Sequence, residues 1–567
     1  MKLRTSFFNP TVFRKDLTRF APTWALYTVG LFMMLAVCMD SDFEYRKAMN
    51  LAEIIGFMAV LNMGYGLLNG QLLFGDLFSS KHCNALHAMP LRRECWFFTH
   101  TVSGLLFSFG PNLVMCIVAG LMLGGGWPAA ALWLLAVTMQ YLFFFGLAVL
   151  SALCVGNRFA MVLLYGIINF LSLIVYWFYY SIYEPLLYGV YCDPEIFTTL
   201  CPVWQLGGTG YDLVQVTKDH SSLSMHDFAL GEGWGYLTIC ALIGIGLLGL
   251  ALMLYRRRKL ESAGDFMAVR ALEPVFLGLY TMSMAAFFQM FADLFSQDEY
   301  IFLGLGMVIG FFTGLMLIKR TIRVFRLRTI LTFLLVGVAF AGSMVLTYID
   351  ILGVTRYVPR AEQVEAVYLD SWRSDPEAVF LDSPGFDAPE DVELACQLHQ
   401  AILDGEREDK SDYYTGICLT YQMKNGRVIQ RYYPSVAAYS TAGELAAPFL
   451  SNTAFILGGT PGEVLKNLGY VQFYDWENEN TPYGELPGWM GKGLLKAIIQ
   501  DCDAGRMAQH PGYRDAGSRD IGTVDFQWVD ENGNWIYKNI SIFSDSFYTR
   551  RYLEDTVRPW LAENGYE

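Results

Sequence analysis

The chain has 567 residues, of which 54% are hydrophobic and only 17% are charged, and its formal net charge is −14. An average soluble protein carries about 25% charged residues. The length and the apolar composition exclude disordered, collagen-like and small disulfide-rich proteins. The acidic balance excludes nucleic acid as a partner, because proteins that bind it present a basic surface to the phosphates.

The charge is divided unevenly along the chain. Residues 353–567 contain 18 Lys and Arg against 33 Asp and Glu, a net charge of −15. The first 352 residues contain 22 basic and 21 acidic side chains, a net charge of +1. We therefore expect a near-neutral membrane part followed by an acidic domain with the composition of a soluble protein.

Residues 1–20 are expected to contain an amphipathic helix that lies in the cytoplasmic interface of the membrane. Asn9 can cap this helix and Pro10 suits its first position. Its apolar residues share one face: Val12, Phe13, Leu17 and Phe20. A charged segment beside the membrane with no special role is the alternative.

Nine apolar stretches follow, and a helix needs about 20 such residues to cross the hydrocarbon core of a bilayer. They are residues 21–39, 53–75, 97–123, 129–153, 159–182, 235–255, 275–294, 300–318 and 330–349. We expect a six-span unit over residues 21–255 and three additional spans with cytoplasmic loops over residues 256–352. The predicted fold is a polytopic α-helical membrane protein with about nine spans, followed by an extracytoplasmic domain.

The positions of Lys and Arg predict the orientation, because cytoplasmic loops carry an excess of these residues. If the N-terminus is cytoplasmic, 19 of the 22 basic residues in the first 352 positions fall on the cytoplasmic side. Nine crossings then place residues 353–567 outside the cell. The predicted location is the plasma membrane, with a cytoplasmic N-terminus and an extracytoplasmic C-terminal domain.

Two short motifs resemble ABC-2-type transporter permeases of Gram-positive bacteria. The first motif is LFSSK at residues 77–81 followed by LHAMPLRR at residues 86–93, and the second is RRRKLESAGD at residues 256–265. In those permeases the segment after the second span contacts the nucleotide-binding subunit. The resemblance implies a six-span unit followed by further spans and a C-terminal extracytoplasmic domain of unassigned function.

The resemblance implies that loop 77–94 couples the chain to an ATPase. The implied contact residues are Leu77, Ser79, Leu86, His87, Met89, Pro90, Arg92, Arg93, Arg256, Arg258 and Glu261. Physically, the apolar residues of such a loop can fill a groove on a partner, while its arginines set the register through charge pairs. Anchoring of the membrane helix is a sufficient alternative explanation for the basic run at residues 256–259.

The sequence contains no GxxxxGK[ST] segment, the loop that cradles nucleotide phosphates. We therefore predict that the chain is not an enzyme and has no cofactor of its own, and that a separate ABC ATPase subunit binds ATP. A second permease subunit, identical or different, is also expected, because one subunit cannot enclose a transport path.

Four polar residues inside the apolar stretches are candidates for the transport path: Asn62, Asn69, Asn112 and Gln140. Hydrogen bonds between helices are the favoured explanation for them, since such contacts are common in helix bundles. In the loop after the fifth stretch, Cys192 and Cys201 are a candidate disulfide if the compartment is oxidising. No metal site is predicted.

The acidic domain is predicted to be α+β. Residues 390–404 have the apolar spacing of a helix, and a last helix is expected from about residue 546 to 565. Asn425-Gly426 predicts a hairpin with a type I′ turn that pairs Met423 with Val428. A second hairpin is predicted over residues 524–542.

Catalytic signatures such as HExxH and GxSxG are absent from the sequence of this domain. Four aromatic residues there are assigned to the core, with a ligand surface as the alternative: Tyr470, Phe473, Tyr474 and Trp476. The leading hypothesis for the whole chain is an ABC exporter subunit for a hydrophobic, amphipathic or peptide-like compound. A membrane-anchored sensor whose outer domain binds a ligand is the alternative, and a cell-envelope enzyme is disfavoured.

Overall fold

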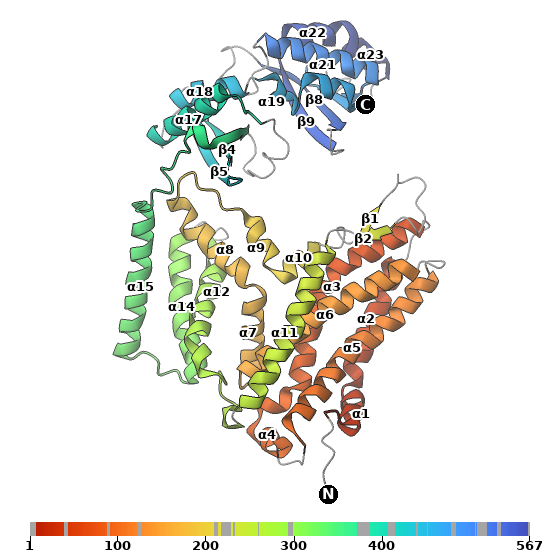
Figure 1. The fold of residues 1–567 in the computed structure, drawn as a ribbon, viewed down its shortest axis with the longest axis vertical. Helices are drawn as coiled ribbons and strands as arrows, with labels where there is room; N and C mark the ends of the chain where they lie inside the picture. Colours follow the sequence, from red (N-terminus) through yellow and green to blue (C-terminus); the bar gives the residue numbers. More distant parts are fainter. Residues whose placement is uncertain are drawn as a thin grey trace. The chain divides into compact units, whose positions relative to one another are not determined.

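The computed structural model of the chain is shown in Figure 1. It describes residues 7–567 except for 39–43, 88–90, 123–126, 209–213, 217–227, 231–232, 259, 293–298, 371–384, 406–413, 438–439, 451, 478–482, 505, 507–518, 530–534 and 565–567. The chain divides into two compact units. The first unit comprises residues 1–181 and 194–341, and the second comprises residues 182–193 and 342–567.

The first unit is a helix bundle, and a helix occupies each of the nine predicted apolar stretches. The long helices are α2 (Ala21–Cys38), α3 (Glu44–Leu73), α5 (Arg93–Met122), α6 (Trp127–Cys154), α7 (Arg158–Asn169), α8 (Leu171–Ile182), α11 (Trp234–Arg257), α12 (Glu273–Gln289), α14 (Glu299–Lys319) and α15 (Leu327–Tyr348). The last residue of α8 and the end of α15 belong to the second unit.

Within the described residues, six helices are long and apolar enough to cross a membrane: α5, α6, α11, α12, α14 and α15. Two bent pairs, α1 with α2 (59°) and α7 with α8 (63°), raise the number to eight if each pair is one span. Helix α3 covers residues 53–73 of the predicted stretch 53–75 but is not among the candidate spans found within the described residues. By length and composition, these helices are consistent with a membrane protein that has six to eight candidate spans in its described residues.

Close helix packing in this unit depends on glycine, as is typical of membrane bundles. A β-carbon on Gly146 of α6 would lie 2.5 Å from the carbonyl oxygen of Gly244 on α11, so these two backbones are in direct contact. Helices α12 and α14 approach each other in the same way at Gly306 and Gly310. The buried residues around α2, α3, α5, α6 and α11 form one continuous core.

Short elements lie at the two ends of the bundle. One end carries α1 (Pro10–Arg19), η1 (Gly75–Phe78) and α4 (Ser80–His87), and the opposite end carries α9 (Pro194–Thr199), α10 (Pro202–Gly208), β1 (Val214–Val216) and β2 (Phe228–Leu230) (Figure 1). Helix α1 confirms the predicted N-terminal helix: the Asn9 side chain accepts from the amides of Thr11 and Val12. The buried residue of α1 is Asp16, which was not expected.

The second unit confirms a fold that mixes helices and sheets. Its strands are β3 (Val364–Asp370), β4 (Tyr414–Met423), β5 (Val428–Ala437), β6 (Leu468–Asp475), β7 (Tyr483–Glu485), β8 (Asp520–Val529) and β9 (Trp535–Phe543). Its helices are η2 (Glu184–Leu186), η5 (Ala361–Gln363), α17 (Pro389–Asp404), α18 (Thr441–Leu450), α19 (Thr453–Leu457), α20 (Pro461–Lys466), α21 (Gly488–Asp503), α22 (Phe547–Tyr552), a π-helical turn (Leu553–Val557) and α23 (Arg558–Asn564). The predicted helix at 390–404 and the last helix are both present.

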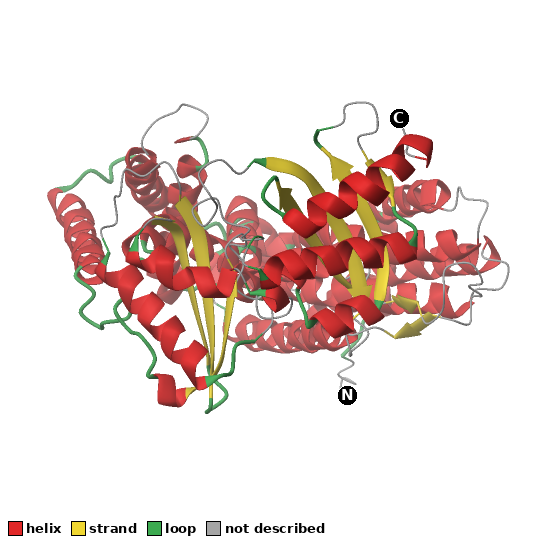
Figure 2. Cartoon of the chain, turned by 90° about the horizontal axis from the view of Figure 1, so that it is seen from above, coloured by secondary structure: helices red, strands yellow, loops and turns green. Residues whose placement is uncertain are grey.

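The same order of elements occurs twice in this unit. The first half runs β3, α17, β4, β5, α18, and the second runs β6, α21, β8, β9, α22 with the short β7 added. The sheet orders are β3-β4-β5 and β7-β6-β8-β9, antiparallel throughout. Helices lie across one face of each sheet (Figure 2), and the buried residues of both halves form a single core.

The first hairpin corrects one prediction. Val428 pairs with Gln422, not with Met423, so the register differs by one residue. Of the two turn residues Asn425 and Gly426, only Gly426 has a positive φ, at 79°, whereas a type I′ turn needs two. The Gly426 amide donates to the Met423 carbonyl at 2.8 Å, which is the pattern of a three-residue loop with a left-handed glycine.

Residues 182–193 leave the bundle between α8 and α9 and pack on β5 of the second unit. Val190 forms a β-bridge with Arg431, and the Tyr432 amide donates to the Gly189 carbonyl at 3.2 Å. Gly189 has φ +74° and lies against the Tyr433 ring, so a larger residue would not fit there. The bundle sequence therefore contributes an edge segment to the first sheet.

Candidate functional site

The predicted coupling loop forms two short helical pieces, η1 and α4, before α5 begins at Arg93. Leu77 of η1 is buried and Ser79 is half-buried. The Ser80 hydroxyl donates to the Ala263 carbonyl at 3.0 Å and so connects α4 to the loop after α11. Leu86 and His87 are the last turn of α4, while Met89 and Pro90 lie outside the described residues.

Arg93 holds the first turn of α5 against the end of α11. Its Nη1 donates to the Arg258 carbonyl at 3.0 Å, and the carbonyls of Tyr255 and Arg256 lie 3.4 Å from the same atom. These are carbonyls at the C-terminus of α11, which have no partner within the helix and attract cations. Arg93 therefore caps a neighbouring helix, a role that sequence reasoning did not foresee.

Arg258 connects three elements at the same end of the bundle. Its Nη1 donates to the carbonyls of Ala152 and Leu153 at the end of α6, at 2.9 and 3.2 Å. Its Nη2 donates to the carbonyl of Leu77 in η1 at 3.2 Å. Burial lowers the pKa of this guanidinium, but an arginine stays protonated in proteins. The second motif thus contains a half-buried cation that joins the end of α11 to α6 and η1.

The loop after α11 is fastened to the turn after α6. Val155 bridges Met267, and the Gly264 amide donates to the Gly156 carbonyl at 2.8 Å. Gly264 has φ +95°, which favours glycine. The Ala-Gly part of the second motif is therefore explained by the fold.

The other predicted contact residues are more accessible. Arg92 is exposed, and Glu261 is exposed in η3 (Leu260–Ser262). Arg256 is paired with Glu94 at 3.1 Å. Glu261 also lines a cavity of about 530 Å³ between the ends of α6 and α11. The charged residues of its lining are Arg257, Arg258, Glu261, Asp265 and Arg270.

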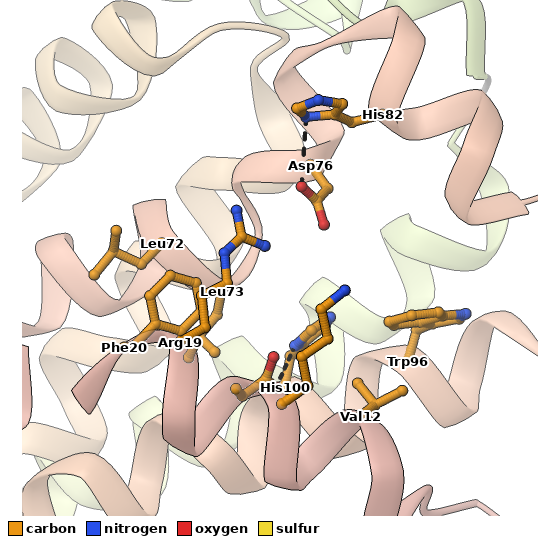
Figure 3. Close-up of a pocket in the computed structure, with 11 residues that line it drawn as sticks. Val12, Arg19, Phe20, Leu72, Leu73, Asp76, His82, Trp96 and His100 are labelled. Carbon is orange, nitrogen blue, oxygen red and sulfur yellow. Dashed lines mark hydrogen bonds and ion pairs between the residues drawn. The ribbon is translucent and has the colours of Figure 1, made fainter.

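A second cavity, of about 240 Å³, lies between α1, the end of α3, η1 and α5 (Figure 3). Beside it, the Asp16 carboxylate accepts from Ser103 at 2.9 Å and lies 2.8 Å from His100 Nδ1. The Asn9 amide donates to Thr99 on the same helix. Across the cavity His82 and Asp76 are 3.7 Å apart. These contacts attach the N-terminal helix to α5 through a buried polar cluster.

The four candidate path residues are fully buried, and three of them contribute to one polar network with Tyr27 of α2. Asn62 donates to Gln140 at 3.2 Å, and Gln140 donates to the Ile55 carbonyl at 3.0 Å. Asn112 lies 3.4 Å from the Tyr27 hydroxyl, which lies 3.4 Å from Asn62. These contacts are hydrogen bonds between helices, which is the explanation that we favoured for these polar residues over a transport path.

Asn69, the fourth candidate, donates to the Tyr141 hydroxyl at 2.8 Å, and that hydroxyl donates to the Gly104 carbonyl at 2.9 Å. This chain of bonds joins α3, α6 and α5. The Oδ1 atoms of Asn69 and Asn112 are buried without a hydrogen-bond partner in the described structure. The network therefore has unused acceptors at the centre of the bundle.

The predicted disulfide is not formed. Cys192 and Cys201 both lie in the described part of the chain, and no disulfide joins them. Cys201 is fully buried and its Sγ donates to the Asn169 carbonyl at 3.4 Å. A spacing of eight intervening residues was therefore not sufficient evidence for a disulfide; helix α9 lies between the two positions. Groups of three or more potential metal ligands are also absent from the described residues.

Sequence reasoning missed the cluster of Asp16, His100 and Ser103. A signal existed for it: Asp16 interrupts the basic face of an amphipathic segment, and His100 stands at the start of an apolar stretch. Each is costly to bury alone, so the two residues are mutual partners. The pairing itself could not be read from the sequence.

Comparisons with protein-family models, with curated proteins and with solved structures found no match for this chain. The structure and the physical chemistry of its residues therefore carry the functional argument.

Proposed function

We propose that the chain is the membrane-spanning permease subunit of an ATP-driven ABC transporter that exports a hydrophobic, amphipathic or peptide-like compound. A separate ATPase subunit binds and hydrolyses ATP and docks at the η1–α4 segment. A second permease subunit completes the transport path. In this proposal α3 and the two bent helix pairs also cross the membrane, which gives nine spans.

The observation that carries the proposal is the fixed mounting of η1 and α4 on the bundle. Arg258 joins η1 to the end of α6, and Arg93 joins the start of α5 to the end of α11. Ser80 joins α4 to the loop after α11. A push on α4 is therefore transmitted to three long helices at once, as a coupling element requires.

The distribution of charge supports the docking side. The end of the bundle that carries α4 also holds Arg92 and the Arg256–Arg258 run, and most basic residues of the first 352 fall on this side of the nine spans. Cytoplasmic loops carry this excess. An ATPase is cytoplasmic, so the proposed docking segment and the proposed cytoplasmic face coincide.

The test is affinity purification of the full-length chain from its native host, followed by identification of co-purifying P-loop ATPases. We expect such an ATPase with the native chain and at least several-fold less of it with Arg92→Glu, because Arg92 is exposed beside α4 and is free to meet an acidic partner. Arg93 is unsuitable for this test, since its substitution would also disturb α11.

Arg323→Glu is the matched control, because Arg323 is an exposed arginine in the loop between α14 and α15, on the same proposed side. It should retain the ATPase. Absence of any P-loop ATPase would contradict the proposed function. If both variants lost the ATPase equally, an ATPase partner would still be supported, but its docking at the η1–α4 segment would be contradicted.

A further inference from the structure

The sheet of the second half has one face covered by helices and one face that points outward. Alternate residues of its strands are buried, including Val471 and Phe473 on β6. The cross-strand register places Tyr470 beside Gln527 and Gln527 beside Tyr537. The outward positions are Tyr470, Gln472, Tyr474 and Trp476 along β6, Thr523, Asp525 and Gln527 on β8, Trp535, Tyr537 and Asn539 on β9, and Glu485 on β7. We call this set the tyrosine face.

Aromatic side chains dominate the tyrosine face, and several are accessible. Trp476 is 68% exposed, Trp535 is 66% exposed and Tyr537 is 50% exposed. The Trp476 indole donates to Thr523 at 3.1 Å, which holds the ring on the sheet. Trp535 lies over Gly469, where a β-carbon would come within 2.9 Å of its ring. Rigid aromatic groups on a sheet bind partners at a low entropic cost.

The face is also acidic. Asp525 lies near its centre, where it is only 8% exposed and accepts from Asn539 at 2.5 Å, and Glu485 is exposed on the edge strand β7, beyond β6. No Lys or Arg occupies the outward positions named above. Burial and then the hydrogen bond with Asp525 raise the pKa of Tyr537 to about 12, so its hydroxyl stays protonated at neutral pH. The surrounding domain has a net charge of −15 over residues 353–567.

The first half shows that the fold does not require such a face. The equivalent positions on β4 are Cys418 and Thr420, and both are fully buried. The equivalents of Trp535 and Tyr537 on β5 are Val428 and Gln430, which contribute no aromatic ring. Tyr368 stands at the equivalent of Tyr470, so the two halves differ at the positions of Trp535 and Tyr537, and these two aromatic residues are not needed to form the sheet.

We propose that the tyrosine face binds a cationic peptide. Arginine or lysine side chains of the peptide lie over the exposed rings of Trp535, Tyr537 and Trp476, where cation–π attraction acts. The exposed carboxylate of Glu485 supplies the opposite charge, the buried carboxylate of Asp525 adds negative potential to the face, and the acidic domain attracts the peptide over a longer distance. The inference concerns the second unit alone and stands whether or not the chain is a transporter subunit.

The test uses the full-length chain in nanodiscs of zwitterionic lipid. A fluorescently labelled peptide of alternating Arg and Ser is titrated against it, with the Glu and Ser peptide and empty nanodiscs as probe controls. We expect saturable binding of the Arg peptide only, weaker at high salt. Asp525→Asn with Glu485→Gln, and separately Trp535→Ser with Tyr537→Ser, should each weaken binding about three- to tenfold.

Glu365→Gln with Glu393→Gln is the matched control, because both carboxylates are exposed and lie in the first half. It should bind as the native chain does. Hydrogen exchange of peptides from β6 and α21 checks that each variant keeps the fold of the second half. Binding of the Glu peptide, equal loss with the control variant, or no effect of either face variant in a folded chain would each overturn the proposal. Salt-independent binding of a neutral glycan in place of the Arg peptide would overturn it as well.

Discussion

His399 shows how burial sets the chemistry of a single side chain in this molecule. It is fully buried on α17, with Nε2 2.7 Å from the Tyr433 hydroxyl and Nδ1 3.2 Å from the Tyr421 hydroxyl. Desolvation, with a smaller contribution from Arg431, lowers its pKa to about 3. The imidazole is therefore neutral near pH 7 and acts as a hydrogen-bonding core residue.

This environment predicts a loss of stability in acid. The pKa of His399 is about 3 in the folded state and about 6.5 when unfolded, so between these values the unfolded state binds the extra proton. The free energy of unfolding is unaffected by this group above pH 6.5 and falls as the pH drops toward 3, by up to about 1.4 kcal/mol per pH unit. This loss of stability is measured by hydrogen exchange of α17 peptides at pH 7 and at pH 5, with the rates normalised to the intrinsic exchange rates.

His399→Gln is the matching variant, because its amide can still bond to tyrosine hydroxyls but does not titrate. Its α17 peptides should show a smaller difference between the two pH values than the native chain. Equal acid sensitivity of both proteins would mean that other groups cause the effect.

At the scale of elements, helix ends determine how the η1–α4 segment is attached to the bundle. Helices α6 and α11 both end at the face of the bundle that carries α4, and their last carbonyls are satisfied by arginines of other segments. Such carbonyls need partners when they are buried. The predicted coupling motifs therefore contain two kinds of arginine: Arg92 is exposed, whereas Arg93 and Arg258 are internal caps.

Arg93→Gln should separate these roles. The shorter side chain cannot reach the carbonyls of Tyr255 and Arg258, so we expect a loss of about 1–3 kcal/mol of stability. Thermal unfolding in detergent should show a lower midpoint. Arg92→Gln is the control and should unfold within about 0.5 kcal/mol of the native chain; an equal shift in both variants would contradict the capping role.

The elements were largely predictable because their signals are local. Apolar length located helices at all nine stretches, and periodicity located α17, whose buried residues include Val392, Ala395 and Leu398. The register of the first hairpin was wrong, since Asn425-Gly426 suits two turn types and the sequence does not distinguish them. The fastening of residues 182–193 to β5 was out of reach, because it depends on pairing across more than two hundred residues.

Surface and core aromatics were also hard to separate by sequence. Phe473 is in the core as expected, but Trp476 is exposed and Tyr470 and Tyr474 lie on the outward face. The alternation of residues along β6 shows which of them share a face of the sheet. It does not show which face is buried until the helices that cover one face are known. The prediction of a Cys192–Cys201 disulfide was wrong for a similar reason, because the number of intervening residues does not say whether the two thiols face each other.

At the scale of the whole molecule, the chain combines a glycine-packed bundle of apolar helices with an acidic unit of two similar halves. The sequence located the division near residue 352, and the structure places it at residue 341/342, within α15. Residues 182–193 also belong to the second unit, although they lie between bundle helices in the sequence. Changes in the second unit can therefore reach α8 and α15 through the chain itself.

The central claim is that an ATPase docks on α4. Asn84 is exposed on α4, so a photo-crosslinking amino acid at this position, introduced in the native host, tests the claim directly. We predict a crosslink to a P-loop ATPase, and none from the same amino acid at Ile196, which is exposed on α9 at the opposite end of the bundle. A crosslink to the ATPase from Ile196 but not from Asn84, or from neither position, would contradict the account.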